Sequence, residues 1–333
     1  MLHTEVCALL GIEHPIISAP MAGTAGAELA AAVSAAGGFG MIGGSAGDAD
    51  WLRGQIRAVR ERTQNPFGVG FISSAPGLDQ LVAVALEERV AAISHSFADP
   101  TPYIAAAHAA GVRVLVQVQT VAQAMVAARA GADIVAAQGT EAGGHTGHTG
   151  IMALLPAVVD AVGGVPVLAA GGIADGRGLA AALMLGAQGA WIGTRFVASR
   201  EALGDARLKE RVVAASADDT ILSKVYDLVG QAPFPREVGH RLLRNEFLTT
   251  WTGRDEEVIA RRDELRRQIA DAEQAGDQRV TGVGAGVAAG LVHSVEPAGE
   301  IVRRIVAEAE SILRRRSRQV LGEQPWGNGE GGA

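Results

Sequence analysis

The 333 residues are enough for one large α/β domain with an insertion, or for two ordinary domains. Hydrophobic residues make up 48% and charged residues 20%, a balance that favours a folded chain with a large core over disorder. A net charge of −7 and only 4% aromatic residues argue against a nucleic-acid-binding protein.

The N-terminal part of the chain has the features of a cytoplasmic protein. Residues 1–15 lack a basic segment followed by an apolar one, so they do not resemble a signal peptide. No apolar run reaches the roughly 18 uninterrupted residues of a membrane span, and we expect no membrane interaction. Cys7 is the single cysteine, which excludes an internal disulfide and fits a reducing compartment. We expect its side chain to be a small, partly buried apolar group.

Eight short apolar segments alternate with alanine-rich segments from residue 15 to about residue 200, and each is predicted to be a strand. These segments are residues 15–20, 38–43, 67–72, 90–95, 112–118, 133–138, 166–170 and 190–194. Because they are continuously apolar, the strands should form a parallel sheet whose outer face is covered by the intervening helices. Eight such units favour a closed TIM (β/α)8 barrel, an α/β fold, over a doubly wound sheet.

The pattern changes after residue 200. Residues 201–294 are helical in character but irregular, and we expect them to form a substrate or cap region inserted after strand eight. Within them, residues 254–278 are highly charged with one apolar stripe, which is typical of a helix with a solvated face. Residues 1–200 and 295–316 are predicted to form the barrel, with a final amphipathic segment as its eighth helix. The tail 317–333 is predicted to be disordered.

Two glycine-bearing loops follow the last two predicted strands. The loop "AAGGIADGRG" (169–178) ends strand seven and opens a helix, and "IGTRF" (192–196) ends strand eight. Phosphates commonly bind after strands seven and eight of this fold, on backbone N–H groups at a helix N-terminus. Two ordinary turns with Asp175 as a helix N-cap are the alternative, but the two loops together favour phosphate binding.

The loop "AQGTEAGGHTGHTG" (137–150) follows the sixth predicted strand and contains His145 and His148. No further ligand lies at metal-binding spacing and no G-x-S-x-G is present, so neither a metal centre nor a serine hydrolase is predicted. At the catalytic end of a barrel, this loop favours an acid–base or charge-stabilising imidazole over one that only binds backbone. A formal G-x-G-x-x-G at residues 38–43 interrupts its strand, so it is not predicted to bind a dinucleotide.

These residues together resemble the flavin-dependent nitronate monooxygenases, formerly called 2-nitropropane dioxygenases, and the related flavin-dependent enoyl-acyl-carrier-protein reductases. The similarity covers most of residues 8–250 and returns around residues 282–313. It is carried by "HPIISAPM", "AAVSAAGGFGMIGG", "PFGVGF", "GADIVAAQGTEAGGHTG" and "VPVLAAGGIADGRGLAAALMLGAQGAWIGTRF". The resemblance implies a TIM barrel that binds FMN without a covalent bond.

The resemblance also implies which residues form the site. His145, in "EAGGH", matches the family's active-site histidine, whereas His148 lies outside the motif and is assigned no role. Gly70 and Gln117 depart from relatives that have Asn and Lys there, which leaves open how the flavin is tuned and the substrate oriented. The positions expected to contact FMN are Met21, Gly70, Gln117, Gln138 and Gly143, with Ala170, Gly171, Gly172, Gly193 and Thr194 around its phosphate.

The function that the resemblance implies first is the oxidation of alkyl nitronates or nitroalkanes by FMN and dioxygen, which gives a carbonyl compound and nitrite. His145 would abstract the α-proton of a nitroalkane or, when protonated, stabilise a nitronate. Two alternatives stay open: an NAD(P)H-dependent FMN reductase of enoyl thioesters or quinones, and a non-redox barrel for a phosphate ligand. The expected partners are a small-molecule substrate and dioxygen, and the alanine-rich exterior suits a monomer or a homodimer.

Overall fold

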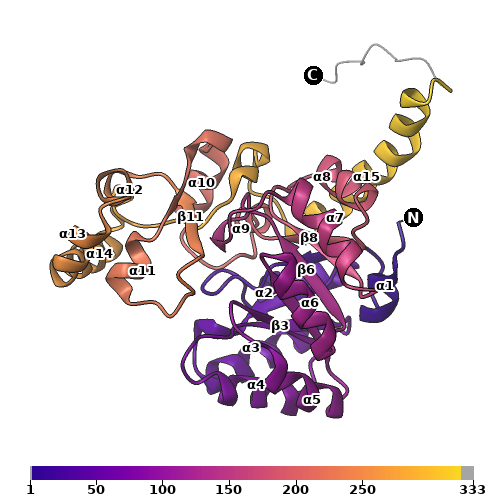
Figure 1. Cartoon of the computed structure of the whole chain (residues 1–333), viewed down its shortest axis with the longest axis horizontal. Coiled ribbons are helices and arrows are strands. Elements are labelled where there is room, and N and C mark those ends of the chain that lie inside the picture. Colours follow the sequence, from indigo (N-terminus) through magenta and orange to yellow (C-terminus); the bar gives the residue numbers. More distant parts are fainter. Residues whose placement is uncertain (1, 324–333) are drawn as a thin grey trace.

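Eight parallel strands form a closed barrel in the computed structural model, which describes residues 2–323 (Figure 1). The strands are β1 (Ile16–Ser18), β2 (Gly40–Gly43), β3 (Phe67–Ile72), β4 (Ala92–Ser96), β5 (Arg113–Val118), β6 (Ile134–Gln138), β8 (Val167–Ala170) and β9 (Gly189–Ile192). Their order is β1-β9-β8-β6-β5-β4-β3-β2, and a parallel bridge between Ile17 and Phe39 joins the two ends. The predicted TIM barrel is therefore confirmed.

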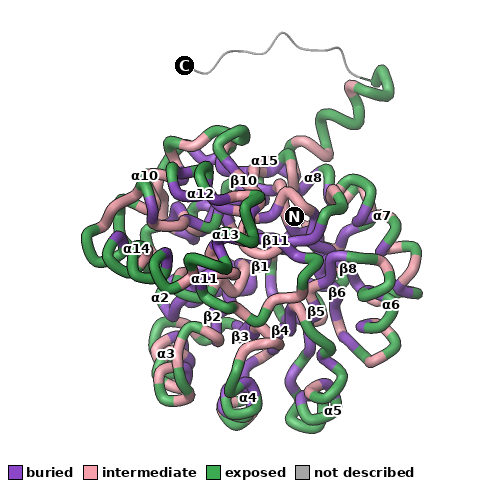
Figure 2. The backbone as a smooth tube through the Cα atoms, turned by 60° about the vertical axis from the view of Figure 1, so that its left-hand side comes forward, coloured by how far each residue is buried: buried purple, intermediate pink, exposed green. Residues whose placement is uncertain are grey.

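Helices surround the barrel and bury its outer face (Figure 2). They are α2 (Ala27–Ala35), α3 (Ala49–Arg62), α4 (Leu78–Glu87), α5 (Thr101–Ala109), α6 (Val121–Ala130), α7 (Ile151–Ala161) and α8 (Gly176–Met184). The long α15 (Ala298–Val320) packs against α8 and α2 and so takes the place of the eighth helix. It extends four residues into the segment 317–333 that was predicted to be disordered; residues 324–333 of that segment lie outside the described residues.

The inside of the barrel is apolar at one end and small or polar at the other. Phe39, Met41, Leu115 and Trp191 form one buried cluster with the short helix α1 (Glu5–Leu10). Cys7 on this helix is an apolar packing residue, as expected, but it is fully and not partly buried. Towards the carboxyl ends of the strands the lining changes to Gly70, Ser94, Gln117 and Gln138. Binding sites in this fold lie at the carboxyl ends of the strands, so the end of the barrel where a ligand is expected is lined by small or polar residues.

Between β9 and α15 the chain forms a lobe beside the barrel, with its own apolar core (Figure 1). Its main elements are α9 (Thr194–Val197), α10 (Ala206–Ala214), β10 (Thr220–Ser223), α11 (Val225–Gly230), β11 (Gly239–Leu243), α12 (Glu246–Trp251), α13 (Asp255–Ala260) and α14 (Arg262–Ala275). The expectation of a helical segment missed β10 and β11, and the charged helix expected over residues 254–278 breaks at Arg261 into α13 and α14. Both keep the expected apolar stripe, because Val258, Leu265 and Ala272 are buried.

The lobe is joined to the barrel by a small antiparallel sheet of order β10-β11-β7. Strand β7 (Gly144–Thr146) lies in the histidine-bearing loop after β6, where the sequence predicted a loop only. Within the described residues, no helix is both long and apolar enough to cross a lipid bilayer.

Two glycine-to-alanine substitutions, one on β2 and one in α3, test how closely α2 packs against β2. A Cβ on Gly40 would lie 1.9 Å from the carbonyl oxygen of Ala30, whereas a Cβ on Gly54, inside α3, meets nothing within 4 Å. Gly40→Ala should therefore destabilise the fold by about 3 kcal/mol through overpacking, and Gly54→Ala should stabilise it by up to about 1 kcal/mol through helix propensity. Thermal unfolding of both variants checks the contrast, and equal midpoints would contradict the close approach of α2 to β2.

Candidate active site

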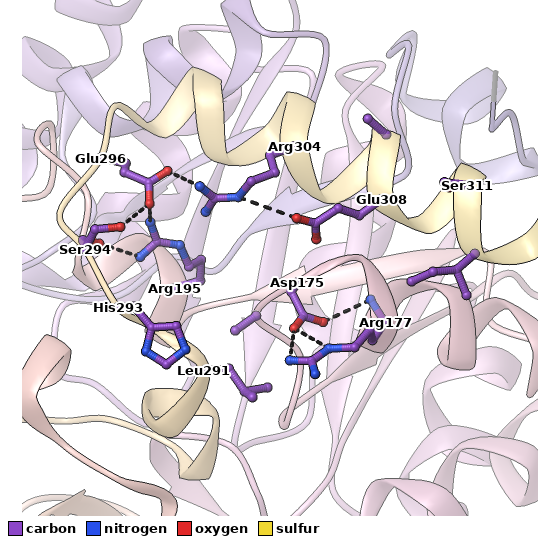
Figure 3. A pocket seen from close by; sticks show the side chains of 13 residues that line it. Asp175, Arg177, Arg195, Leu291, His293, Ser294, Glu296, Arg304, Glu308 and Ser311 are labelled. Carbon is purple, nitrogen blue, oxygen red and sulfur yellow. Dashed lines mark hydrogen bonds and ion pairs between the residues drawn. The ribbon is translucent and has the colours of Figure 1, made fainter. Parts of the chain in front are cut away.

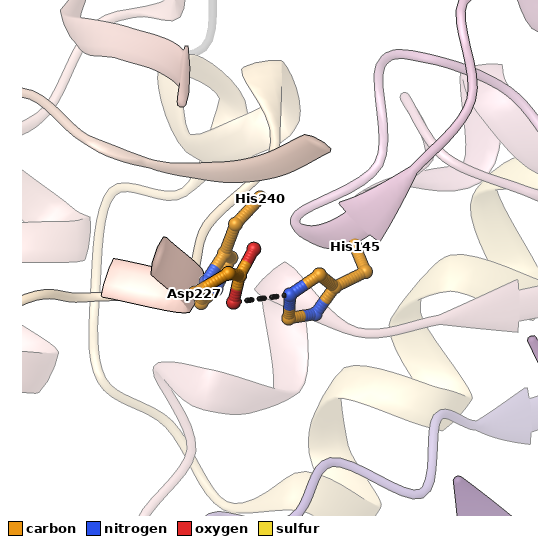
Figure 4. Close-up of side chains that lie close together, drawn as sticks. All are labelled: His145, Asp227 and His240. Atoms are coloured by element: carbon orange, nitrogen blue, oxygen red, sulfur yellow. Dashed lines mark hydrogen bonds and ion pairs between the residues drawn. The ribbon is translucent and has the colours of Figure 1, made fainter. Parts of the chain in front are cut away.

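The pairing of β7 with β11 sets two histidines side by side. His145 on β7 is directly opposite His240 on β11, and their ring centroids are 4.3 Å apart. Asp227, in the first turn of α11, approaches from the lobe and lies 2.9 Å from His145 Nε2 (Figure 4). The side chain of His145 is 11% exposed and that of Asp227 is 16% exposed, so this hydrogen-bonded pair is largely shielded from bulk water.

Two phenylalanines complete the surroundings of His145. The Phe234 ring, from the loop between α11 and β11, stacks on the imidazole with centroids 3.3 Å apart. Phe97, just after β4, meets both rings edge-on. Its φ is 71°, a left-handed conformation that is rare for a bulky side chain and that is found most often at functional sites. The backbone therefore holds Phe97 against the candidate site at a conformational cost.

Burial makes His240 a neutral neighbour of His145. Desolvation, together with the nearby His145, lowers the pKa of His240 from 6.5 to about 4, although Asp227 acts in the opposite direction. Its Nδ1 atom is buried and has no hydrogen-bond partner among the described residues. Because His240 is neutral, the carboxylate of Asp227 is the charged side chain in contact with His145.

The three side chains also have the residue types of a metal site, because one ligand atom from each lies within 4.8 Å of the others. A metal ion, however, lies close to the plane of each imidazole that binds it. The rings of His145 and His240 are stacked only 28° from parallel, so they do not converge on one shared point. The direct contact of His145 with Asp227 indicates a hydrogen-bonded pair instead.

The two loops expected to bind a phosphate lie next to each other, because β8 and β9 are paired. Gly171 and Gly172 have φ values of 99° and 74°, a left-handed pair that turns the backbone after β8. Gly193 and Thr194 follow β9, and the Thr194 hydroxyl accepts a hydrogen bond from Gly286 N. Asp175 is the N-cap of α8, as the alternative of an ordinary turn expects, and its side chain accepts hydrogen bonds from Arg177 N and Gly178 N. This cap does not use the backbone N–H groups of Gly171 and Gly172. The backbone at these loops fits a phosphate group.

The positions expected to border the flavin ring lie around the barrel mouth. Gln117 accepts a hydrogen bond from Ser96, and Gln138 accepts one from Gln119, so both amides have fixed orientations. Gly143 is closely covered by Ala285 and Gly286, and Met21 lies beside Gly193. These small or oriented groups fit a planar, polar ring system.

The departure at Gly70 has a steric reason. A Cβ at this position would lie 2.2 Å from Pro20 Cγ and 2.6 Å from Ser94 Oγ. An asparagine therefore does not fit in this chain unless Pro20 moves. The neighbouring strands occupy the volume that the larger side chain would fill.

A separate cavity of about 720 Å³ lies behind the loop after β8, between α8 and α15 (Figure 3). Arg195 is only 2% exposed and pairs with Glu296, which also binds Arg304. Burial lowers the pKa of Arg195, while Glu296 opposes that shift. Arg304 also lies 3.9 Å from Glu308, so the two arginines of this cluster face two glutamates. Because these charges are balanced, we interpret the cluster as an anchor for α15.

Sequence reasoning placed His145 at the site but missed Asp227, His240, Phe97 and Phe234. Asp227 is 82 residues from His145, and no local motif links the two. His148 is exposed and lies two residues beyond the end of β7. The aromatic pattern "SHSF" (94–97) was a local signal that could have drawn attention to Phe97.

Two buried histidines should make the stability pH-dependent. His95, like His240, has its pKa lowered from 6.5 to about 4 by burial. The unfolded chain therefore binds more protons than the folded one between these values, and stability should fall as the pH drops from about 6.5 to about 4. Replacing His95 by Phe should remove up to about 1.4 kcal/mol per pH unit of this slope. Unfolding of wild type, His95→Phe and the exposed control His148→Asn checks it; an unchanged slope in His95→Phe would contradict a neutral, buried His95.

The chain is similar to a protein-family model, to characterised relatives and to a solved structure. The family model described as nitronate monooxygenase matches residues 3–80 and 71–308. The nitronate monooxygenase of Pseudomonas aeruginosa is 39% identical over 263 residues, covering 65% of this chain and 75% of that protein. A (3aS,4S,5R,7aS)-5-hydroxy-7a-methyl-1-oxo-octahydro-1H-indene-4-carboxyl-CoA dehydrogenase of Mycobacterium tuberculosis is 37% identical over 249 residues, covering 74% and 68%. The structure of FabK from Thermotoga maritima has a TM-score of 0.87 and 36% identity, covering 97% and 100%.

Proposed function

This chain belongs to the nitronate monooxygenase family of oxidoreductases, and we propose that it oxidises alkyl nitronates and nitroalkanes with dioxygen and bound FMN. The products would be a carbonyl compound and nitrite. One dioxygen would oxidise two nitronates to two carbonyl compounds and two nitrite ions. The observation that carries the proposal is the shielded His145–Asp227 pair at the barrel mouth, an acid–base group positioned for a carbon acid or its anion.

Proteins of this family are generally flavin-dependent, and the loops after β8 and β9 support FMN as the specific flavin. Gly171, Gly172 and the end of Ala170 would hold the phosphate from one side, and Gly193 and Thr194 from the other. When bound, FMN supplies the electron-transfer chemistry, and the protein supplies orientation. The ring would lie over the mouth, bordered by Met21, Gly70, Gln117, Gln138 and Gly143.

The lobe of residues 201–294 would serve as the cap of this site. It contributes Asp227 and Phe234, which shield His145 from solvent. Exclusion of water strengthens the electrostatic interaction of an anionic substrate with a protonated imidazole. His145 would therefore act both as a proton acceptor and, once protonated, as a stabilising cation.

Replacing His145 by Asn should lower kcat/KM for a neutral nitroalkane by about 100-fold or more, the usual contribution of a general base. The variant should still bind FMN, because the phosphate loops are unchanged. Nitrite release and the visible flavin spectrum measure the two effects. The exposed neighbour His148, replaced by Asn, is the matched control and should keep full activity. Full turnover in His145→Asn would remove this residue from the mechanism.

A second candidate is an NAD(P)H-dependent reduction of enoyl thioesters, favoured by the match to FabK over 97% of this chain. An anaerobic visible spectrum before and after addition of NADH or NADPH separates the two. For a nitronate oxidase we expect the flavin band to persist. Rapid bleaching would favour the reductase, with thioesters as the next substrates to assay.

A further inference from the structure

We propose that Asp227 is a positioning residue that holds His145 in the tautomer with a free Nδ1 lone pair, so that the site takes a neutral carbon acid and deprotonates it. This inference rests on the proposed function and narrows it. The role of Asp227 should matter for a nitroalkane, which must lose an α-proton in the site, and not for a nitronate, which has already lost it.

The hydrogen bond between the two side chains selects the tautomer. A carboxylate only accepts hydrogen bonds, so the 2.9 Å contact with Asp227 Oδ1 requires the proton to be on His145 Nε2. A neutral imidazole carries one ring proton, which leaves Nδ1 as an acceptor. Among the described residues, the ring of His145 makes its side-chain hydrogen bond through Nε2, and Nδ1 has no partner, so its lone pair is free to accept a proton.

Stacking holds the plane of the imidazole. Phe234 lies 14° from parallel to the ring and His240 lies 28° from parallel, both within 4.3 Å between centroids. Phe97 meets the ring edge-on at 5.9 Å. Turning the ring to present Nε2 instead would break the bond to Asp227 and would have to occur between these neighbours. The tautomer and the ring orientation are therefore fixed together.

One carboxylate and one neutral imidazole are the ionisable side chains in contact with the ring of His145 among the described residues. From the elements packed around the imidazole, the ionisable groups are Asp227 on α11 and His240 on β11, while Phe97 and Phe234 carry no charge. The carboxylate stabilises the imidazolium that forms, and the neutral His240 does not repel it. This arrangement is the one expected for a general base and its orienting partner.

The chemical step is a proton transfer alone. The α-carbon of the nitroalkane loses its proton to His145 Nδ1, and the C–H electron pair forms the C=N bond of the nitronate while the charge moves to the nitro oxygens. The proton on Nε2 stays in its bond to Asp227. The oxidation by dioxygen follows as in the proposed function.

The test compares one substrate in its two protonation states in the FMN-loaded, full-length enzyme. In Asp227→Asn, the amide cannot impose the tautomer, so kcat/KM for the neutral nitroalkane should fall at least about 30-fold, within the range of lost general-base catalysis. The preformed nitronate needs the imidazole only as a stabilising cation and not as a base, so its loss should be smaller, about threefold. A deuterium isotope effect at the α-carbon should also grow in this variant, because proton removal becomes more rate-limiting.

A second histidine–carboxylate pair provides the matched control. His108 Nε2 and Asp133 Oδ2 are also 2.9 Å apart, but Asp133 precedes β6 at the opposite end of the barrel. Asp133→Asn should lower thermal stability and leave the ratio of the two substrate activities unchanged. Equal losses for nitroalkane and nitronate in Asp227→Asn would overturn the inference, as would a wild type that oxidises only the nitronate. A wild type that oxidises neither substrate would instead refute the proposed function.

Discussion

The pairing of β7 with β11 is the interaction on which the candidate site depends. It turns a glycine-rich loop of the barrel into a strand and places His145 opposite His240. The lobe is anchored to the barrel again where its chain returns, by the bridge between Ser199 and Glu296 and by the ion pair of Arg195 with Glu296. With both attachments in place, Asp227 is held at hydrogen-bonding distance from an imidazole that belongs to the barrel.

The barrel mouth depends on a different constraint: the residues that line it at Gly70 and on the neighbouring strands must have small side chains or none. Below it, Phe39, Met41 and Trp191 fill the interior; at the mouth, glycine and small polar residues replace them. At Gly70 the space that a larger side chain would need is already occupied by Pro20 and Ser94. A departure from the pattern of relatives at one position is therefore coupled to the residues that pack beside it.

The barrel was predictable from the sequence because its signals are local. Continuous apolar segments mark the strands, and glycines mark the loops after β8 and β9, whatever the rest of the chain does. Strands β7, β10 and β11 have three to five residues each, with no clear alternation, and exist because they pair with one another. Asp227 and His240 reach His145 only through that pairing, so neither composition nor spacing pointed to them. His145 itself was identified through the resemblance of its loop to a family and not through any property of a lone histidine.

The origin of the partners of His145 has a consequence for catalysis. The proposed base comes from the barrel, while the carboxylate that contacts it and the phenylalanine that stacks on it come from the lobe. If the lobe moves away from the barrel, the imidazole loses its tautomer preference and gains water at the same time. Water exclusion and activation of the base are thus one event, because the same elements, α11 and the loop before β11, provide both. A base at His145 would therefore depend on the lobe both for its orientation and for its shielding from water.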